Sequence, residues 1–212
     1  MANSTDEMAR LRSHVEGSIE TKRKLLAAAS DSILEAARIM THRLAEGGKI
    51  LLCGNGGSAA DAQHIAAEFV SALNHHAFMR PGIAAIAITT DTSFLTASGN
   101  DFGFAGVFER QVQALGRPGD VVIGISTSGN SENVLRALDY AQTHGMHAIG
   151  LTGAQGGKMP SPGRTVIRVP SDVTQFVQES HIMIGHILCD LVERSLTYHE
   201  HGVAGKASAE QR

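Results

Sequence analysis

The sequence predicts an α/β fold, in which a three-layer, doubly wound, five-stranded parallel sheet carries an N-terminal helical extension. Short, continuous apolar runs that stop at glycine or at polar residues predict strands buried on both faces. Segments with helical periodicity alternate with these runs, which is the pattern of β–α units. Glycine and serine clusters follow the predicted strands, at the edge of the sheet where such folds bind their ligands.

The composition is that of one ordinary folded domain. The chain has 212 residues, 42% of them hydrophobic and only 4% aromatic, so its core must be built from Ala, Ile, Leu and Val. The formal net charge is −3, and no run of Lys and Arg predicts a nucleic-acid partner. No apolar stretch reaches the ~18–20 residues of a membrane span. Two cysteines without a CxxC motif fit a reducing cytosol, so we expect a cytoplasmic protein with no membrane partner.

Three regions divide the chain. Residues 1–46 are predicted to contain two helices, broken near Ser30, that serve packing or oligomerisation. Residues 47–198 are predicted to form the domain with the sheet. Residues 199–212 are small and polar, and we expect a disordered tail there.

Strands and helices alternate within the sheet domain. Ser58 and Ser131 stand where helices are predicted to start, and both are expected to act as N-caps. The predicted strands are residues 49–53, 83–88, 121–125, 148–151 and 165–169, and the predicted helices are residues 58–73, a short one after Asp91, 107–115, 132–144 and 173–196.

The loop after the first strand, residues 54–58, reads Gly-Asn-Gly-Gly-Ser and precedes a helix. Backbone N–H groups and the helix dipole favour an anion at such a position. The loop is not a nucleotide P-loop, because GxxxxGK[ST] is absent. It matches a dinucleotide fingerprint only weakly, because the acidic residue expected ~20 positions further on is missing. A plain tight turn is the alternative.

The loop after the third strand, residues 126–131, reads Ser-Thr-Ser-Gly-Asn-Ser. Its hydroxyl groups can donate to phosphate oxygens without adding charge. A serine-rich capping loop is the alternative, but two such loops on one sheet favour a small phosphorylated substrate.

Two helices carry candidate metal or acid–base groups. His64 and Glu68 are four residues apart, so they share one helix face and could bind one metal ion, with Asp61 placed to orient the imidazole. A surface ion pair is the alternative. The C-terminal helix carries Gln178, Glu179, His181 and His186, where His186 could equally be a core histidine among aliphatic residues.

Five segments carry a resemblance to a known family. They read CGNGGSAADAQHIAAEF from Cys53, TASGNDFGF from Thr96, GDVVIGISTSGNSENV from Gly119, LTGAQGGKM from Leu151 and QESHIMIGHI from Gln178. On these segments, which span most of residues 47–196, the chain resembles the sugar isomerase (SIS) family. Within that family it is similar to the sedoheptulose-7-phosphate isomerases, also called phosphoheptose isomerases.

The resemblance implies a flavodoxin-like sheet assembled into a homotetramer, with active sites near subunit interfaces. It implies one Zn²⁺ per subunit, held by His64, Glu68, Gln178 and His186. Helical spacing alone would instead pair Gln178 with His181. The resemblance also implies substrate contacts from Asn55, Gly56, Gly57, Glu68, Asn100, Asp101, Ser126, Thr127, Ser128, Ser131 and Gln178.

The implied reaction converts sedoheptulose 7-phosphate to D-glycero-D-manno-heptose 7-phosphate by proton transfer through an enediol. This is the first step in making heptose precursors for surface glycans such as lipopolysaccharide. Glu68 and His186 are the implied catalytic pair, with Glu68 the expected base, although the sequence leaves the division of roles open. The family usually has an arginine where Ala72 stands here, and Arg80 is a candidate substitute.

Two other readings stay open at this point. The chain could be a non-catalytic SIS protein, either a sugar-phosphate-binding regulator or a protein that binds a replication initiator. It could also isomerise another sugar phosphate. All four implied metal positions are present, which favours the enzyme.

Overall fold

The computed structural model describes residues 4–76 and 79–207. Its centre is a sheet of five parallel strands in the order β2-β1-β3-β4-β5. The predicted fold class is therefore confirmed. The strands are β1 (Ile50–Gly54), β2 (Ala85–Ala87), β3 (Val121–Ile125), β4 (His147–Thr152) and β5 (Thr165–Arg168).

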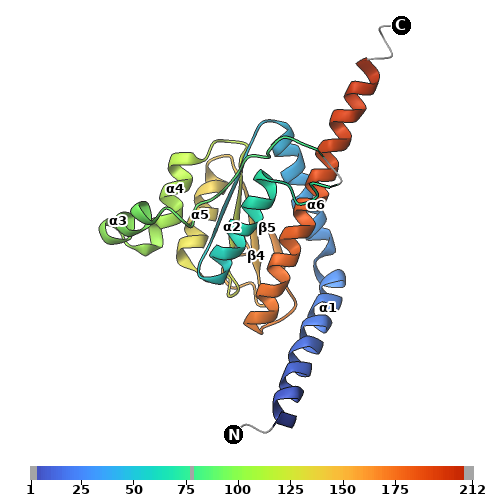
Figure 1. Ribbon diagram of the computed structural model, residues 1–212. Helices are drawn as coiled ribbons and strands as arrows, with labels where there is room; N and C mark the ends of the chain where they lie inside the picture. The colour runs from blue at the N-terminus through green and yellow to red at the C-terminus, as the bar shows by residue number, and fades with distance from the viewer. Residues whose placement is uncertain (1–3, 77–78, 208–212) are drawn as a thin grey trace.

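Helices cover both faces of the sheet (Figure 1). The helical elements are α1 (Ser4–Ala45), α2 (Gly57–Val70), α3 (Thr92–Phe102), a 3-10 turn η1 (Phe104–Gly106), α4 (Val107–Leu115), α5 (Glu132–Thr143) and α6 (Thr174–Ala207). Because side chains alternate along a strand, Ile50 and Leu52 face the core shared with α1, α2 and α6. Leu51 and Cys53 face the core shared with α4 and α5. The result is the predicted three-layer sandwich.

Helix α1 corrects the prediction of two helices. It runs unbroken from Ser4 to Ala45, through the expected break at Ser30. The hydroxyl of Ser30 donates to the carbonyl of Leu26, so this residue is satisfied inside the helix. Ile33 and Met40 are buried beyond it, and their packing on the core outweighs the local propensity of the sequence for a break.

The predicted cap at Ser58 is wrong, whereas the cap position predicted for Ser131 is confirmed. Helix α2 begins at Gly57, with Gly56 at the N-cap, so Ser58 lies inside the first turn and is buried. Ser131 does occupy the N-cap of α5, but its side chain makes no capping bond. Its Oγ lies 2.8 Å from the Oγ of Ser126. The Asp91 side chain does cap the short helix predicted after it, accepting from the N–H of Phe94.

The remaining differences lie at the ends of elements. Helix α2 ends at Val70, before the predicted Leu73, and β2 has three residues rather than six. Helix α6 continues to Ala207, beyond the predicted end at Leu196 and through the first part of the predicted tail. The rest of that tail, residues 208–212, lies outside the described residues.

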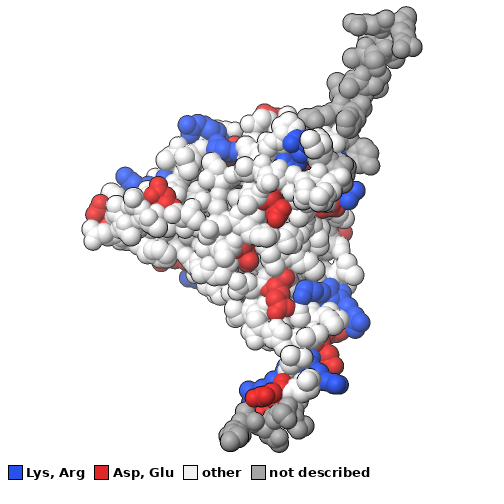
Figure 2. Space-filling view, in the orientation of Figure 1, with Lys and Arg blue, Asp and Glu red and all other residues white. Residues whose placement is uncertain are grey.

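Within residues 4–76 and 79–207, no helix combines the length and the apolar character needed to cross a membrane. On the face shown in Figure 2, basic and acidic side chains are interspersed over a largely uncharged surface.

Candidate active site

Three side chains from two helices meet at one point. The Nε2 atoms of His64 on α2 and His186 on α6 are 2.9 Å apart, and Glu68 Oε1 is 3.3 Å from His64 Nε2. One ligand atom from each residue lies within 4.8 Å of the others. His64 is half exposed and Glu68 is more sheltered, so the cluster opens to solvent.

Helices α2 and α6 lie side by side and run in the same direction, which brings this cluster together (Figure 1). Gly185 makes the close approach possible: a Cβ there would lie 2.5 Å from Cδ1 of Ile65. The next residue along α6 is His186, and the residue before Ile65 is His64. The glycine therefore brings the two imidazoles within bonding range of each other.

The donor set fits a zinc ion. Tetrahedral zinc holds its ligand atoms about 3.3 Å apart, because each bond to nitrogen or oxygen is about 2.0–2.1 Å long. The spacings of 2.9 and 3.3 Å between the cluster's atoms are close to that value. Two histidines and one glutamate also form a donor set that catalytic zinc sites use, with a fourth position left for substrate or water.

Gln178 lies on α6, eight residues before His186. Its amide packs against Gly57 at the start of α2, where an added Cβ would come 1.8 Å from Nε2. At 1.5 Å per residue, the eight-residue separation places Gln178 roughly 12 Å from His186 along α6. Its role as the fourth metal ligand therefore stays a prediction.

His181, the partner that helical spacing proposed for Gln178, faces the interior. It is fully buried, and this burial lowers the pKa of its imidazole to about 4. A neutral, enclosed ring of this kind contributes packing, and the structure does not bring it to the His64 cluster.

Asp61 lies one turn before His64 and is buried. Its Oδ2 has no hydrogen-bond partner among the described residues, and its role in orienting the His64 ring stays a prediction. Burial raises the pKa of Asp61 to about 6, although the electrostatic interaction with His64 acts to lower it. Asp61 lines a pocket with Gln178 and Glu179.

The glycine loop presents backbone rather than side chains. Gly56 adopts a φ of +55°, which suits glycine, and a Cβ on Gly57 would displace the Gln178 amide. The amide of Asn55 is engaged with Asn133 of α5 in two reciprocal bonds, each 2.9 Å long. This pair joins the glycine loop to the start of α5, just behind the serine loop.

Three hydroxyl groups of the serine loop lie close to one another. Ser126 is buried and bonds Ser131, while the exposed Ser128 lies at the longer distance of 3.5 Å from Ser126. Thr127 and Ser128 line a cleft of about 310 Å³. Gly153, Ala154 and Gln155, which follow β4, line the same cleft. The hydroxyls are thus set beside a space large enough for a phosphate group.

Asn100 and Asp101 lie elsewhere in the molecule. They sit near the end of α3, both are exposed, and the amide of Asn100 donates to Asp101 over 2.9 Å. Helix α3 lies on the opposite side of the chain from α6 (Figure 1). Within one chain, these two residues do not join the His64 cluster.

Sequence reasoning missed Asn133 and the pairing of Arg80 with Glu193. Asn133 is a buried residue in the first turn of α5, where asparagine is common for local reasons. Arg80 is turned inward to Glu193 of α6, so it does not reach outward in place of the arginine absent at Ala72. Both pairings join parts of the chain that are far apart in sequence, and no local sequence pattern predicts them.

Comparison with known proteins shows the family to which the chain is similar. A family model described as "SIS domain" matches residues 14–153. The phosphoheptose isomerase of Aneurinibacillus thermoaerophilus is 51% identical over 190 residues, which cover 88% of this chain and 93% of that protein.

Two solved structures agree with that relationship. A phosphoheptose isomerase from Neisseria gonorrhoeae is 45% identical with a TM-score of 0.82, covering 88% of this chain and 98% of that one. A phosphoheptose isomerase from Francisella tularensis is 39% identical with a TM-score of 0.83, covering 89% of this chain and 98% of that one.

Proposed function

This chain belongs to the SIS domain family and, within it, resembles the phosphoheptose isomerases closely enough to be an isomerase of sugar phosphates; from this premise we propose its substrate, product and metal. The proposed reaction converts sedoheptulose 7-phosphate to D-glycero-D-manno-heptose 7-phosphate in the cytoplasm. The product is proposed to supply heptose for surface glycans, including lipopolysaccharide.

One observation carries the proposal: the convergence of His64, Glu68 and His186. A ketose-to-aldose conversion needs a base at C1, a proton donor at C2, and groups that stabilise charge on the two oxygens. A carboxylate and two imidazoles at one solvent-open point can meet these needs. A sugar-binding regulator has no need of them.

In the proposed mechanism, Glu68 removes a proton from C1 of the ketose. The electron pair forms the C1–C2 double bond of the enediol, and the C2 carbonyl oxygen takes up a proton. A proton then returns at C2, the O1 hydroxyl proton leaves, and the C1 aldehyde forms. His186 is placed to exchange protons with the two oxygens, because it shares the point where Glu68 lies.

The proposed metal is one Zn²⁺ per subunit, held by His64, Glu68 and His186, with Gln178 as the fourth ligand. When bound, zinc would supply positive charge that polarises the oxygens at C1 and C2. The phosphate is proposed to rest on Ser126, Thr127, Ser128 and Ser131, with the backbone of Asn55, Gly56 and Gly57 nearby. Fixing the phosphate end holds C1 and C2 against the base.

We also propose a homotetramer in which the site is completed across subunits. Asn100 and Asp101 are the residues that support this, because α3 lies far from α6 in the same chain. If these side chains contact substrate, a neighbouring subunit is the natural source of them.

The test is turnover of purified protein with sedoheptulose 7-phosphate, followed by NMR, before and after zinc is stripped and restored. Loss of aldose formation on stripping, with recovery on adding zinc, supports the isomerase and the metal site together. Turnover without any dependence on metal would keep the reaction and remove the zinc. A zinc-loaded protein that binds the sugar phosphate without converting it would be a regulator.

A further inference from the structure

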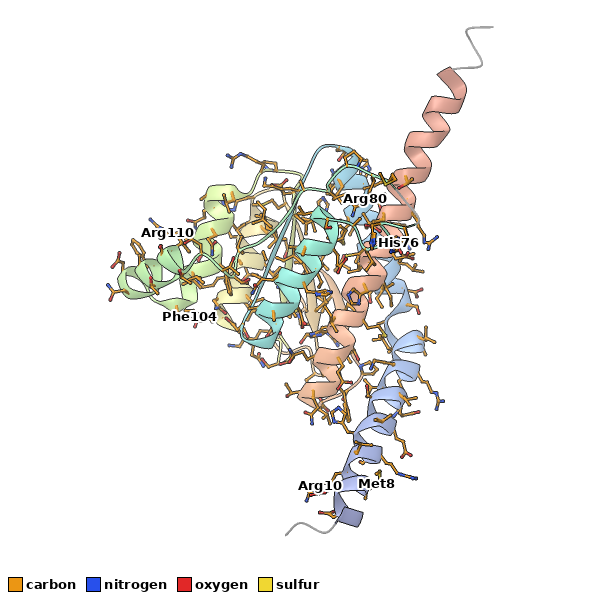
Figure 3. All side chains as sticks on the ribbon, viewed as in Figure 1. Met8, Arg10, His76, Arg80, Phe104 and Arg110 are labelled. Carbon is orange, nitrogen blue, oxygen red and sulfur yellow. The ribbon has the colours of Figure 1, made fainter. Side chains whose placement is uncertain are left out.

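A second pair of charged residues joins α2 to α6 near the metal cluster. Arg80 and Glu193 form an ion pair in which the side chains are only 4% and 1% exposed. The Arg80 Nε donates to Glu193 Oε1 over 3.0 Å, and its NH2 group donates to the same oxygen. Figure 3 shows Arg80 beside the upper part of α6, where the end of α2 approaches it.

Arg80 also closes the end of the helix that carries Glu68. Its Nη1 donates to the carbonyl of Phe69 over 2.9 Å, and its Nη2 donates to the carbonyl of Glu68 over 3.1 Å. The last carbonyls of a helix have no partner inside it, and a cation there also complements the helix dipole. One guanidinium therefore holds the backbone of Glu68 and the carboxylate of Glu193 together.

Glu193 gathers the turn that follows α2 as well. Its carboxylate accepts from the N–H of Leu73 over 3.0 Å and from the N–H of Asn74 over 3.2 Å. Glu193 comes seven residues, or two helical turns, after His186, so both project from one side of α6. The pair is thus anchored on the same helix face as a predicted metal ligand.

We propose that Arg80 is a positioning residue for the metal cluster: it fixes the backbone of Glu68 relative to α6 and thereby sets the gap between Glu68 and His186. This inference rests on the proposed metal site. It adds to that site the contact that holds α2 and α6 in fixed relative positions. A metal site needs ligand atoms placed to within a few tenths of an ångström, and the fork of arginine gives fixed directions that lysine lacks.

The variant that tests this is Arg80→Lys, which keeps the positive charge but loses the planar guanidinium with its fixed donor directions. Glu193→Gln is the second variant, because it keeps the size of the side chain but places an amide where Asn74 donates. The matched control is Asp120→Asn. Asp120 is another buried carboxylate with three donors, from Lys49 and the N–H of Arg117, and none of them belongs to α2 or α6.

Three measurements are made on each full-length protein: zinc affinity by competition with a chelator, the visible spectrum of the cobalt-substituted protein, and the melting temperature. We expect Arg80→Lys and Glu193→Gln to weaken zinc binding by about 10–100-fold and to change the cobalt spectrum, as loss of a supporting residue does at metal sites. At saturating zinc, kcat should fall more than KM changes. Asp120→Asn should lower the melting temperature and leave zinc affinity and the spectrum unchanged.

Wild-type zinc affinity and cobalt spectrum in both variants would overturn the inference while leaving the proposed function intact. Equal loss of zinc affinity in Asp120→Asn would also overturn it, because the effect would then follow from lower stability alone. A wild-type protein that binds no metal would remove the metal from the proposed function and overturn this inference with it.

Discussion

His64 and His186 are separated by 122 positions in the sequence, yet their Nε2 atoms lie 2.9 Å apart. A hydrogen bond at this distance needs one nitrogen to carry a proton and the other to be bare, and two protonated rings would repel. A bound cation satisfies both nitrogens at once.

Zinc should stabilise the folded protein through His64. At a free zinc concentration of 100 times the dissociation constant, the gain is about 2.7 kcal/mol in the free energy of unfolding. His64→Gln should lose most of this gain. His42→Gln, which alters an exposed histidine elsewhere, should keep it. Melting curves with and without zinc decide the matter, and an undiminished gain in His64→Gln would remove this residue from the metal site.

Asn133 should matter for substrate affinity although it is buried. Asn133→Ala removes both bonds to Asn55 and frees the glycine loop from α5. A hydrogen bond contributes about 1 kcal/mol, so loss of two bonds, or about 2 kcal/mol, should raise KM by up to about 30-fold, with a smaller change in kcat. Steady-state kinetics check this, with Gln113→Ala, an exposed amide on α4, as the control. An unchanged KM would mean that the loop holds its shape without Asn133.

His181 should make the protein less stable in mild acid. Burial lowers the pKa of His181 from 6.5 to about 4, so below pH 6.5 the unfolded chain takes up a proton that the folded protein refuses. Stability is therefore lost as the pH falls from 6.5 towards 4, by up to about 1.4 kcal/mol per pH unit. When the free energy of unfolding is measured with urea across this pH range, it should depend less steeply on pH in His181→Leu than in wild type.

His144→Leu serves as the control for that slope, because His144 is exposed at the end of α5. The stability of His144→Leu should depend on pH as that of wild type does. If the stability of His181→Leu shows the same dependence, the acid sensitivity does not come from His181.

Asp61 should cost stability at neutral pH. Burial raises the pKa of Asp61 from 3.8 to about 6, so the folded protein retains a proton between these values that the unfolded chain releases. Its contribution to stability falls as the pH rises from 3.8 to 6. Metal-free Asp61→Asn should therefore be more stable than wild type at pH 7.5, by up to about 3 kcal/mol, and the gain should shrink at pH 4.5.

The exposed Asp31→Asn is the matching control and should change stability little at either pH. Lower stability of Asp61→Asn at pH 7.5 would mean that the Asp61 carboxylate has a favourable partner in solution.

The strands were predictable because their signal is local. Ile50 to Cys53 form a continuous apolar run that ends at a glycine, and such runs leave few alternatives to a buried strand. The helix ends were less predictable, because tertiary contacts decide them. Ser30 suggested a break, yet α1 continues since the residues beyond it are buried against the core.

The site was predictable only in part. The spacing of His64 and Glu68 predicts a shared helix face, but nothing local indicates that His186 joins them, and only the resemblance supplied it. Gln178 was also supplied by the resemblance alone; its amide packs on Gly57 within one chain, and its role as a ligand stays a prediction. The bonds of Asn133 with Asn55 and of Arg80 with Glu193 join positions far apart in sequence, and folding alone brings them together.

The most direct test of the account is the turnover of sedoheptulose 7-phosphate in D2O by wild-type protein and by Glu68→Gln, followed by NMR. We predict that wild type forms the aldose with deuterium at C2, because the abstracted proton exchanges with solvent. Glu68→Gln should lose about 10²–10⁴ in rate while still binding the sugar phosphate. A Glu68→Gln protein with wild-type kcat would contradict the assignment of Glu68 as the base, and with it the central claim about this site.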